Sequence, residues 1–356
     1  MVRQKIPVII MLTGEIGGPI SWATRLRETL KNNSNYEILL VGRYIDDKVK
    51  SIFDLTVSDI DSVYNLLKSL EPAIIIPNWL WNLYPLCAKL AAKGKELRCI
   101  GFCRGDSEET YYRHLRKYAP IISHFIGVSP KCGEDLYRQF PDRTSDITVL
   151  PTAVFVPQNL TRTYHRNPIR IVYGGRIEQK QKRVMDFIPV IKGLLSRDLD
   201  FVFDIVGSGS YLLQFLEALQ ECKHGGRVRY LGRLFPEEMQ KIWMEHDIFV
   251  QLSDSEGTSN SMLEAMACAT VPLVTATSSG VEGVIDHKKN GFVVPIGSTD
   301  LVVDIIEELV NFPVLLEEVG TAAHRTTHQF SMSNYAKKFL SILDKVSSMP
   351  VRTVND

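Results

Sequence analysis

The sequence predicts an α/β protein built from two Rossmann-like domains that face each other across a cleft. Three observations predict it: continuous apolar runs rich in Val and Ile, helix-like patterns between them, and a fresh start of this alternation after a polar stretch in mid-chain. Continuous apolar runs are typical of strands buried on both faces of a parallel sheet, and the helices between them form right-handed crossovers. A chain of 356 residues is long enough for two such domains.

The first half of the chain, residues 1–155, is expected to form the N-terminal domain. Its apolar runs predict strands at 6–12, 36–42, 73–77, 97–103, 124–129 and 147–151. Helical patterns lie between them, at 21–33, 61–71, 110–119 and 130–140. Each strand is thus followed by a polar turn and most are followed by a helix, which favours a doubly wound sheet.

The second half repeats this pattern after a polar stretch, PQNLTRTYHRNP, that shows neither a helical nor a strand periodicity. We interpret 156–167 as a linker and 168–330 as the C-terminal domain. Its expected strands lie at 169–175, 200–207, 228–233, 247–253 and 271–276. The last segment, 331–356, predicts a helix with an apolar stripe that packs on either domain, including a return to the N-terminal one.

Composition excludes several classes of protein. The formal net charge is zero, which argues against a nucleic-acid partner, and the six cysteines form no CxxC pair, which is typical of reduced core residues in a cytoplasmic protein. The apolar start of the chain fits a buried first strand better than a signal peptide. No apolar run reaches the ~18 residues that a membrane span needs. Trp79, Trp81, Tyr84 and the segment YYRHLRKY leave peripheral contact with the inner membrane face open, against the simpler interpretation of an aromatic core.

A group of basic residues follows the first strand of the second domain. The segment YGGRIEQKQKR places Arg176, Lys180, Lys182 and Arg183 at the carboxyl end of that strand. Cations at a helix start oppose the helix dipole unless an anion is present, which favours a phosphate or diphosphate site over a solvated helix start.

Two carboxylates flank a second helix start in the stretch SEGTSNSMLEAM. Thr258 is the expected N-cap, which would leave the backbone N–H groups of 259–261 available to an anion. Glu256 precedes this cap and Glu264 lies inside the apolar helix, where a carboxylate needs hydrogen-bond donors. Hydroxyl groups would supply them, so carboxylates and cations together indicate a sugar nucleotide.

These segments resemble the retaining GT-B fold glycosyltransferases of family four. The resemblance rests on Gly175-Arg176, Lys182, the E-x7-E element from Glu256 to Glu264 and the following LEAMACATVPLV, and it covers most of 170–345. It implies that Arg176 and Lys182 bind the donor diphosphate, with Lys180 a less fitting alternative to Lys182.

The same resemblance implies roles for the remaining residues of the second domain. Glu256 would contact the transferred sugar, Glu264 would hold the ribose hydroxyls, and the main chain at Leu234 would meet the nucleobase. Four residues would present their backbone to sugar and phosphate oxygens: Gly257, Thr258, Ser259 and Asn260.

The N-terminal domain, where the acceptor would bind, resembles the family more loosely. Gly17 and Gly18 fit the place of its Gly-rich loop, where the backbone approaches the donor phosphate or the acceptor. Arg104 stands where many members have a His that contacts the donor sugar. Three interpretations follow: Arg104 contacts a phosphate, contacts an anion on the acceptor, or marks reduced activity.

The resemblance implies sugar transfer from a nucleoside diphosphate sugar with retention of configuration, in polysaccharide or glycoconjugate biosynthesis. It implies a glycan, lipid-linked or small-molecule acceptor, no cofactor and no metal ion; the DxD triplets at 59–61 and 198–200 are expected to open a helix and to lie in a turn. Charge stabilisation by Arg176, Lys182 and helix N–H groups then needs no protein nucleophile. Two alternatives remain: a nucleotide-sugar epimerase of the same fold, and a non-catalytic sugar-nucleotide-binding subunit.

Overall fold

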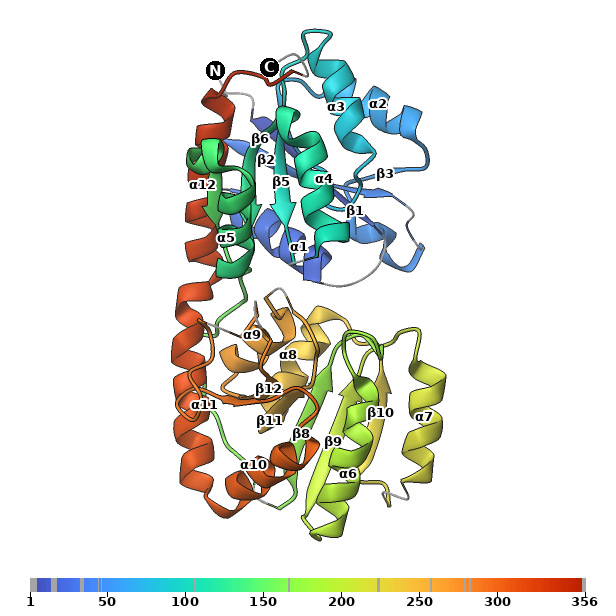
Figure 1. Ribbon diagram of the computed structural model, residues 1–356, viewed down its shortest axis with the longest axis vertical. Helices are drawn as coiled ribbons and strands as arrows, with labels where there is room; N and C mark the ends of the chain where they lie inside the picture. Colours follow the sequence, from blue (N-terminus) through green and yellow to red (C-terminus); the bar gives the residue numbers. More distant parts are fainter. Residues whose placement is uncertain are drawn as a thin grey trace. The chain divides into compact units, whose positions relative to one another are not determined.

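The computed structural model describes residues 5–13, 18–32, 35–43, 45, 47–105, 107–165, 167–222, 225–256, 258–277, 280–281 and 283–353. The chain divides into two compact units (Figure 1). Unit 1 comprises Met1–Ala153 and Met332–Asp356, and unit 2 comprises Val154–Ser331. The C-terminal segment from Met332 onward therefore belongs with the first half of the chain.

Unit 1 is built on one parallel sheet. Its strands are β1 (Ile6–Thr13), β2 (Tyr36–Arg43), β3 (Leu55–Val57), β4 (Ala73–Ile76), β5 (Leu97–Cys103), β6 (Ile122–Gly127) and β7 (Ile147–Val149). They lie in the order β3-β2-β1-β4-β5-β6-β7. The chain thus extends the sheet on one side of β1 and then returns to extend it on the other, as a doubly wound fold requires.

The helices of unit 1 are α1 (Gly18–Leu30), α2 (Ile60–Ser69), α3 (Leu83–Ala91), α4 (Arg113–Tyr118), α5 (Pro130–Gln139) and α12 (Met332–Ser348). Two begin at side-chain caps that the sequence supplies. Asp59 accepts a hydrogen bond from the backbone of Ser62 at the start of α2, and Ser129 accepts one from Cys132 at the start of α5. Asp59 of the first DxD triplet is therefore used in starting a helix.

Unit 2 repeats this architecture. Its strands are β8 (Ile169–Gly174), β9 (Phe201–Val206), β10 (Val228–Gly232), β11 (Ile248–Gln251), β12 (Val271–Thr275) and β13 (Phe292–Val294), in the parallel order β10-β9-β8-β11-β12-β13. Its helices are α6 (Phe187–Ser196), α7 (Leu212–Glu221), α8 (Pro236–Glu245), α9 (Asn260–Ala267), α10 (Thr299–Asn311) and α11 (Pro313–Thr327). Asp198 of the second DxD triplet lies in the turn before β9, at a positive φ of 52°.

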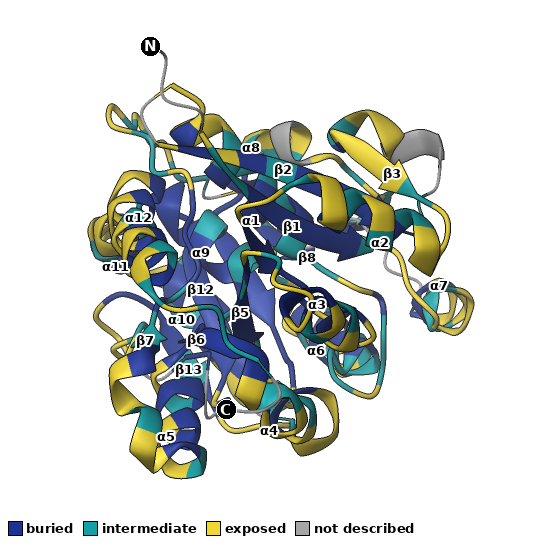
Figure 2. Cartoon of the chain, turned by 90° about the horizontal axis from the view of Figure 1, so that it is seen from above, coloured by how far each residue is buried: buried dark blue, intermediate teal, exposed yellow. Residues whose placement is uncertain are grey.

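The core of each unit lies between its sheet and the helices on both faces. Every residue of β4 and β12 is buried, and the central strands of both sheets are dark in Figure 2 whereas the outer faces of the helices are exposed. Burial on both faces explains why the strand sequences read as continuous apolar runs instead of alternating ones.

The C-terminal helix α12 completes the core of unit 1. Its Tyr335 and Phe339 pack against the indole of Trp22 in α1, with ring centroids 6.3 and 6.2 Å apart. Tyr36 of β2 donates a 2.8 Å hydrogen bond to Asp344 near the end of α12. The last helix therefore covers a face of the first sheet although it follows unit 2 in the chain.

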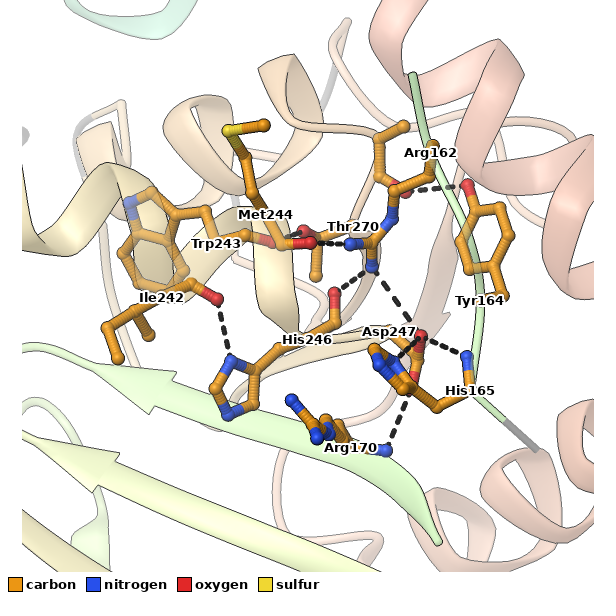
Figure 3. Close-up of polar contacts among 11 residues, drawn as sticks. Arg162, Tyr164, His165, Arg170, Ile242, Trp243, Met244, His246, Asp247 and Thr270 are labelled. Atoms are coloured by element: carbon orange, nitrogen blue, oxygen red, sulfur yellow. Dashed lines mark hydrogen bonds and ion pairs between the residues drawn. The ribbon is translucent and has the colours of Figure 1, made fainter. Parts of the chain in front are cut away.

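The expected linker, 156–167, carries no helix or strand where it is described, and buried polar contacts hold its second half on unit 2 (Figure 3). Asp247, which is fully buried, accepts hydrogen bonds from the backbone N–H groups of His165 (2.9 Å) and Arg170 (2.8 Å). Arg162 forms an ion pair with the same carboxylate at 3.6 Å and donates to the carbonyl oxygens of Met244 and His246. Asp247 thereby replaces the backbone partners that an irregular segment lacks.

The aromatic segment that left membrane contact open is mostly internal. Tyr84 is completely buried and its ring stacks on that of Trp81, which also stacks on His114 at 4.6 Å. For Tyr84 the interpretation of an aromatic core therefore holds, since this residue of α3 also stacks on the ring of Tyr118. Trp79 is 38% exposed. Among the described helices, none has both the length and the apolar character that crossing a bilayer requires.

Candidate functional site

Each sheet has a point at which the strand order reverses, and these points position the candidate residues. The reversal lies between β1 and β4 in unit 1 and between β8 and β11 in unit 2. Loops at the carboxyl ends of such neighbouring strands diverge and leave a crevice, which is where open α/β sheets bind ligands. Most candidate residues of unit 2 follow β8 and β11, Leu234 follows β10, and Arg104 of unit 1 follows β5, next to β4.

The loop after β8 packs closely against the loop after β9. The backbone N–H of Ile177 donates to Ser208 at 2.9 Å, and that of Gly175 donates to Val206 at 3.0 Å. A Cβ atom on Gly207 would lie 1.8 Å from the carbonyl oxygen of Gly175, and Gly207 has a φ of +145°. The glycines of VGSGS therefore allow the close approach that holds the Arg176 loop in place.

Lys182 and Glu256 form a buried ion pair, although 74 residues separate them. The Nζ atom of Lys182 lies 2.5 Å from Oε1 of Glu256, and the two side chains are 13% and 8% exposed. Ser253 donates a 2.6 Å hydrogen bond to the same oxygen. The structure thus brings together the cation expected at the diphosphate and the carboxylate expected at the sugar.

Arg176 lies at the open side of this cluster. Its side chain is 60% exposed and pairs with Glu178 at 2.9 Å. It also donates to the amide oxygen of Gln181, whose amide nitrogen donates to the carbonyl of Ser255 at 2.9 Å. The backbone carbonyl of Gln181 accepts from Asp254 at 2.8 Å. Gln181 therefore joins the loop after β8 to the loop after β11.

Arg183 takes part in a second link between these loops. Its backbone is left-handed, with a φ of 49°, which is uncommon for a residue other than glycine. Its guanidinium donates to Asp186 at 2.8 Å and to Asp254 at 3.1 Å. The hydrogen bond that Arg183 donates to Asp186 is the main reason that the pKa of Arg183 is raised. Lys180, by contrast, is exposed.

Helix α9 begins one residue later than the sequence predicts. Ser259, and not Thr258, is the N-cap, because its hydroxyl accepts a hydrogen bond from the backbone of Met262 at 3.2 Å. The same hydroxyl donates to Gln251 in β11 at 2.6 Å, a tertiary contact that fixes the cap. The backbone N–H groups at the helix start are thus those of Asn260 and the residues after it.

Glu264 lies in the second turn of α9 and is half-buried. One of its carboxylate oxygens lies 3.3 Å from the indole nitrogen of Trp243, which donates to it. This contact turns Glu264 toward α8. Leu234 follows β10 and is half-buried. Two of the expected site residues, Gly17 and Gly257, lie outside the described residues.

The carboxyl edge of the sheet in unit 1 holds the other candidates. Gly18 is the first residue of α1, directly after the loop that follows β1. Arg104 follows β5, and its guanidinium donates to the side-chain oxygen of Asn78, the second residue after β4. Burial lowers the pKa of Arg104 from its ordinary value. Sequence reasoning missed Asn78 and Gln181, because both act through contacts with residues far along the chain.

Comparison with known proteins supports this picture at the level of fold and family. Residues 168–311 match the family model described as glycosyl transferases group 1. The O-antigen biosynthesis glycosyltransferase WbnH of Escherichia coli is 20% identical over 359 residues, covering 94% of this chain and 98% of that protein. N-acetyl-alpha-D-glucosaminyl L-malate synthase of Bacillus anthracis is 26% identical over 151 residues, which is 42% of this chain and 39% of that protein.

A solved structure shares the fold of the chain. Anabaena HepE, solved in complex with UDP and glucose, superposes with a TM-score of 0.77 at 14% identity, covering 96% of this chain and 99% of that one. Two Rossmann-like units with parallel sheets define the GT-B fold, and unit 2 contains the whole matched segment. Residues 168–311 therefore match the glycosyl transferases group 1, and the fold of the chain is that of the GT-B glycosyltransferases.

Proposed function

We propose that the chain transfers a sugar from a nucleoside diphosphate sugar to an acceptor hydroxyl, with retention of configuration and without a metal ion. The observation that carries this proposal is the buried Lys182–Glu256 pair at the strand reversal of unit 2, beside the start of α9. A cation, helix N–H groups and a carboxylate in one place match the diphosphate and the hydroxyl groups of one donor.

The pair suggests how the site changes when the donor binds. Without donor, Lys182 and Glu256 neutralise each other in a poorly solvated place. A diphosphate oxygen would take over the ammonium of Lys182, and Glu256 would then accept hydrogen bonds from hydroxyl groups of the transferred sugar. Glu264 would hold the ribose hydroxyls, with the indole N–H of Trp243 fixing its orientation.

The chemical step would be assisted by fixed positive charge. When the bond between sugar and diphosphate breaks, negative charge develops on the leaving oxygen and positive charge on the sugar ring. Lys182 and Arg176 would stabilise the leaving group, and Glu256 would stabilise the ring, with all three already in position before the reaction. The departing phosphate would accept the proton of the acceptor hydroxyl, so no protein nucleophile is required.

The relatives support a nucleotide-sugar donor and a role in glycoconjugate or polysaccharide biosynthesis. HepE was solved with UDP and glucose, and WbnH is named for O-antigen biosynthesis. Other relatives are named for malate and for D-inositol 3-phosphate, so the family match leaves the acceptor of this chain open between a glycan, a lipid-linked glycan and a small molecule.

A thermal-shift screen of the full chain against UDP, GDP and ADP sugars tests the proposal, because a ligand that binds the folded state alone raises the Tm. We expect one nucleotide class to raise the Tm of the wild type and of Arg113→Gln, an exposed control, but not of Arg176→Ala. If no nucleotide sugar raises the Tm of the wild type, the proposal fails.

Product analysis with the donor so identified tests the reaction. Transfer should continue with EDTA present, and the anomeric proton of the product should show the configuration of the donor sugar by NMR. An epimerised donor formed without acceptor would instead identify an epimerase, and no product of either kind would identify a binding subunit.

A further inference from the structure

Among the described residues, the groups that contact Arg104 of unit 1 are neutral. Its Cζ atom lies 4.4 Å from the ring centroid of Trp22 and 4.4 Å from that of Phe102. Its Nε and Nη2 atoms donate to the side-chain oxygen of Asn78, at 3.2 and 3.1 Å. Two aromatic rings and one amide oxygen therefore fix the plane of the guanidinium without supplying a negative charge.

Asn78 is held in the orientation that this contact needs. It is buried, with a left-handed φ of 50°, and its amide nitrogen donates to the carbonyl of Met11 in β1 at 2.7 Å. Because the nitrogen must face that carbonyl, the oxygen must face Arg104. Asn78 is thus a positioning residue for the guanidinium.

Arg104 keeps donors that nothing in the described chain uses. A guanidinium has five N–H donors, and the two on its Nε side go to Asn78. The end formed by Nη1 and Nη2 remains, and no carboxylate of the described residues lies within ion-pair distance of it. Arginine stays protonated in proteins, so this charge persists in a partly desolvated place.

A second half-buried arginine in the same unit shows what a structural arginine looks like here. Arg143 also lies over an aromatic ring, that of Phe125, but it pairs with Asp146 and donates to the carbonyls of Ala119 and Ile122. Its charge and its N–H donors thus have partners within the protein. Arg104 has the packing of a structural arginine without these partners.

Arg104 also lies where the fold places ligands. Its partner Asn78 follows β4, and a small cavity lies between Thr13 at the end of β1 and the segment of Asn78 and Trp79. These are the two strands at which the order of the sheet reverses. Arg104, which follows β5 and contacts Asn78, therefore lies at the carboxyl edge of the sheet of unit 1.

We propose that Arg104 binds a carboxylate or phosphate group of the acceptor, so that the preferred acceptor of this chain is anionic. The inference rests on the proposed transferase function. In the proposed function, cations of unit 2 already neutralise the donor diphosphate, and a neutral hexose offers only hydroxyl groups. The acceptor is then the remaining source of a negative charge that pairs with Arg104. The planar end of the guanidinium matches two oxygens of either anion.

Binding of inorganic phosphate to the full chain tests the site without any activity. The background variant Arg176→Ala/Lys182→Ala/Glu256→Gln removes two cations of the unit 2 site together with the carboxylate that pairs with Lys182. At constant ionic strength, phosphate should raise the Tm of this background, and adding Arg104→Gln should abolish the rise while adding Arg113→Gln should not. An equal rise with and without Arg104, or no rise in the background, overturns the proposal.

Transfer assays with matched acceptors then identify the source of the anion. The acceptor pairs differ only in a phosphate or a carboxylate, and each is also tested with a neutral and a uronic acid donor. We expect the wild type to favour a charged acceptor by roughly 10- to 100-fold in kcat/KM, mainly through KM, and Arg104→Gln to lose that preference with donor KM unchanged.

Variants that keep part of the side-chain chemistry of Arg104 distinguish a role in binding from a role in folding. Arg104→Lys retains the charge without the planar fork and should restore part of the preference, whereas Arg104→His should not. A preference that follows the charge of the donor sugar, or equal use of charged and neutral acceptors, overturns the assignment to the acceptor. Unchanged nucleotide binding by Arg104→Gln shows that the proposed function stands independently of this result.

Discussion

The carboxyl edges of the two sheets differ in how their positively charged side chains are paired. In unit 2 three cations of the group after β8 have acidic partners: Lys182 has Glu256, Arg176 has Glu178, and Arg183 has Asp186. In unit 1 Arg104 contacts rings and one amide oxygen.

The difference shows two ways in which one fold prepares a site. Paired charges keep the edge of unit 2 stable without a ligand, and a ligand must replace one partner of each pair to bind. The guanidinium of Arg104 has no acidic partner among the described residues, so its desolvation cost persists and an anionic ligand would offset it. Substitutions that create or remove partners therefore separate the two arrangements.

The largest effect is expected for Lys182, because its removal leaves Glu256 as a buried carboxylate without its ammonium partner. Lys182→Ala should reduce transfer by about 10²- to 10³-fold and lower the free energy of unfolding by about 3–5 kcal/mol. Adding Glu256→Gln should restore much of the stability but none of the activity. Denaturant unfolding and initial rates on the four proteins of this cycle measure both effects, and a double variant as unstable as Lys182→Ala would contradict the pairing.

Acid should affect unit 1 before unit 2. Burial lowers the pKa of His124 in β6 to about 4, and the charge of Lys345 lowers it further than the nearby Asp146 raises it. The unfolded chain takes up this proton near pH 6.5, so stability is complete above that pH and falls as the pH drops toward 4, by about 3 kcal/mol at most.

In unit 2, the buried residue Asp204 of β9 loses its stabilising contribution at a lower pH than His124 does. Burial would raise the pKa of Asp204, but hydrogen bonds from His246 and Arg229 lower it overall, so its contribution is lost only below its ordinary pKa. Hydrogen exchange should therefore show weaker protection of β6 than of β9 between pH 6.5 and 4. His124→Gln should flatten the profile of β6, and equal losses in both strands would contradict this assignment.

A carboxylate placed beside Arg104 should give this cation of unit 1 an acidic partner, like those of the paired cations in unit 2. Asn78→Asp keeps a side chain that tolerates the left-handed backbone and puts a negative charge next to the guanidinium. Phosphate affinity at Arg104 should fall about tenfold or more, while the lost hydrogen bond to Met11 costs about 1–3 kcal/mol. Titration calorimetry measures the affinity, with Asn78→Ala as the control that loses the amide without adding charge; equal affinities in the two variants would rule out the charge effect.

The fold could be predicted because it rests on long buried strands, and the parts that could not be predicted rest on tertiary contacts. Continuous apolar runs mark β1 and β8 in the sequence, whereas β3 and β13 have three residues each and show no period. Thr258 and Ser259 are equally good caps by residue type, and the contact of Ser259 with Gln251 decides between them.

The candidate site was predictable to the same extent. Lys182 and Glu256 could be proposed from residue type and spacing, but their direct contact could not, because 74 residues separate them. Gln181 and Asn78 are single polar residues in loops, and their roles come from partners that only the folded chain brings close. Arg104 could be recognised as a departure from the family pattern, whereas the neutral character of its surroundings needed the structure.

The smallest effect is expected for Arg183, which has an unfavourable backbone and two partly exposed ion pairs. Arg183→Gly removes a left-handed strain of about 1 kcal/mol and loses pairs that contribute about 0–1 kcal/mol each, so the free energy of unfolding should change by less than about 1 kcal/mol. Arg183→Ala keeps the strain and loses the pairs, and should be less stable than Arg183→Gly. If both variants lose as much stability as Lys182→Ala, the exposed ion pairs of unit 2 contribute as much to stability as the buried pair. The contrast between the two edges would then depend on the number of paired charges and not on their burial.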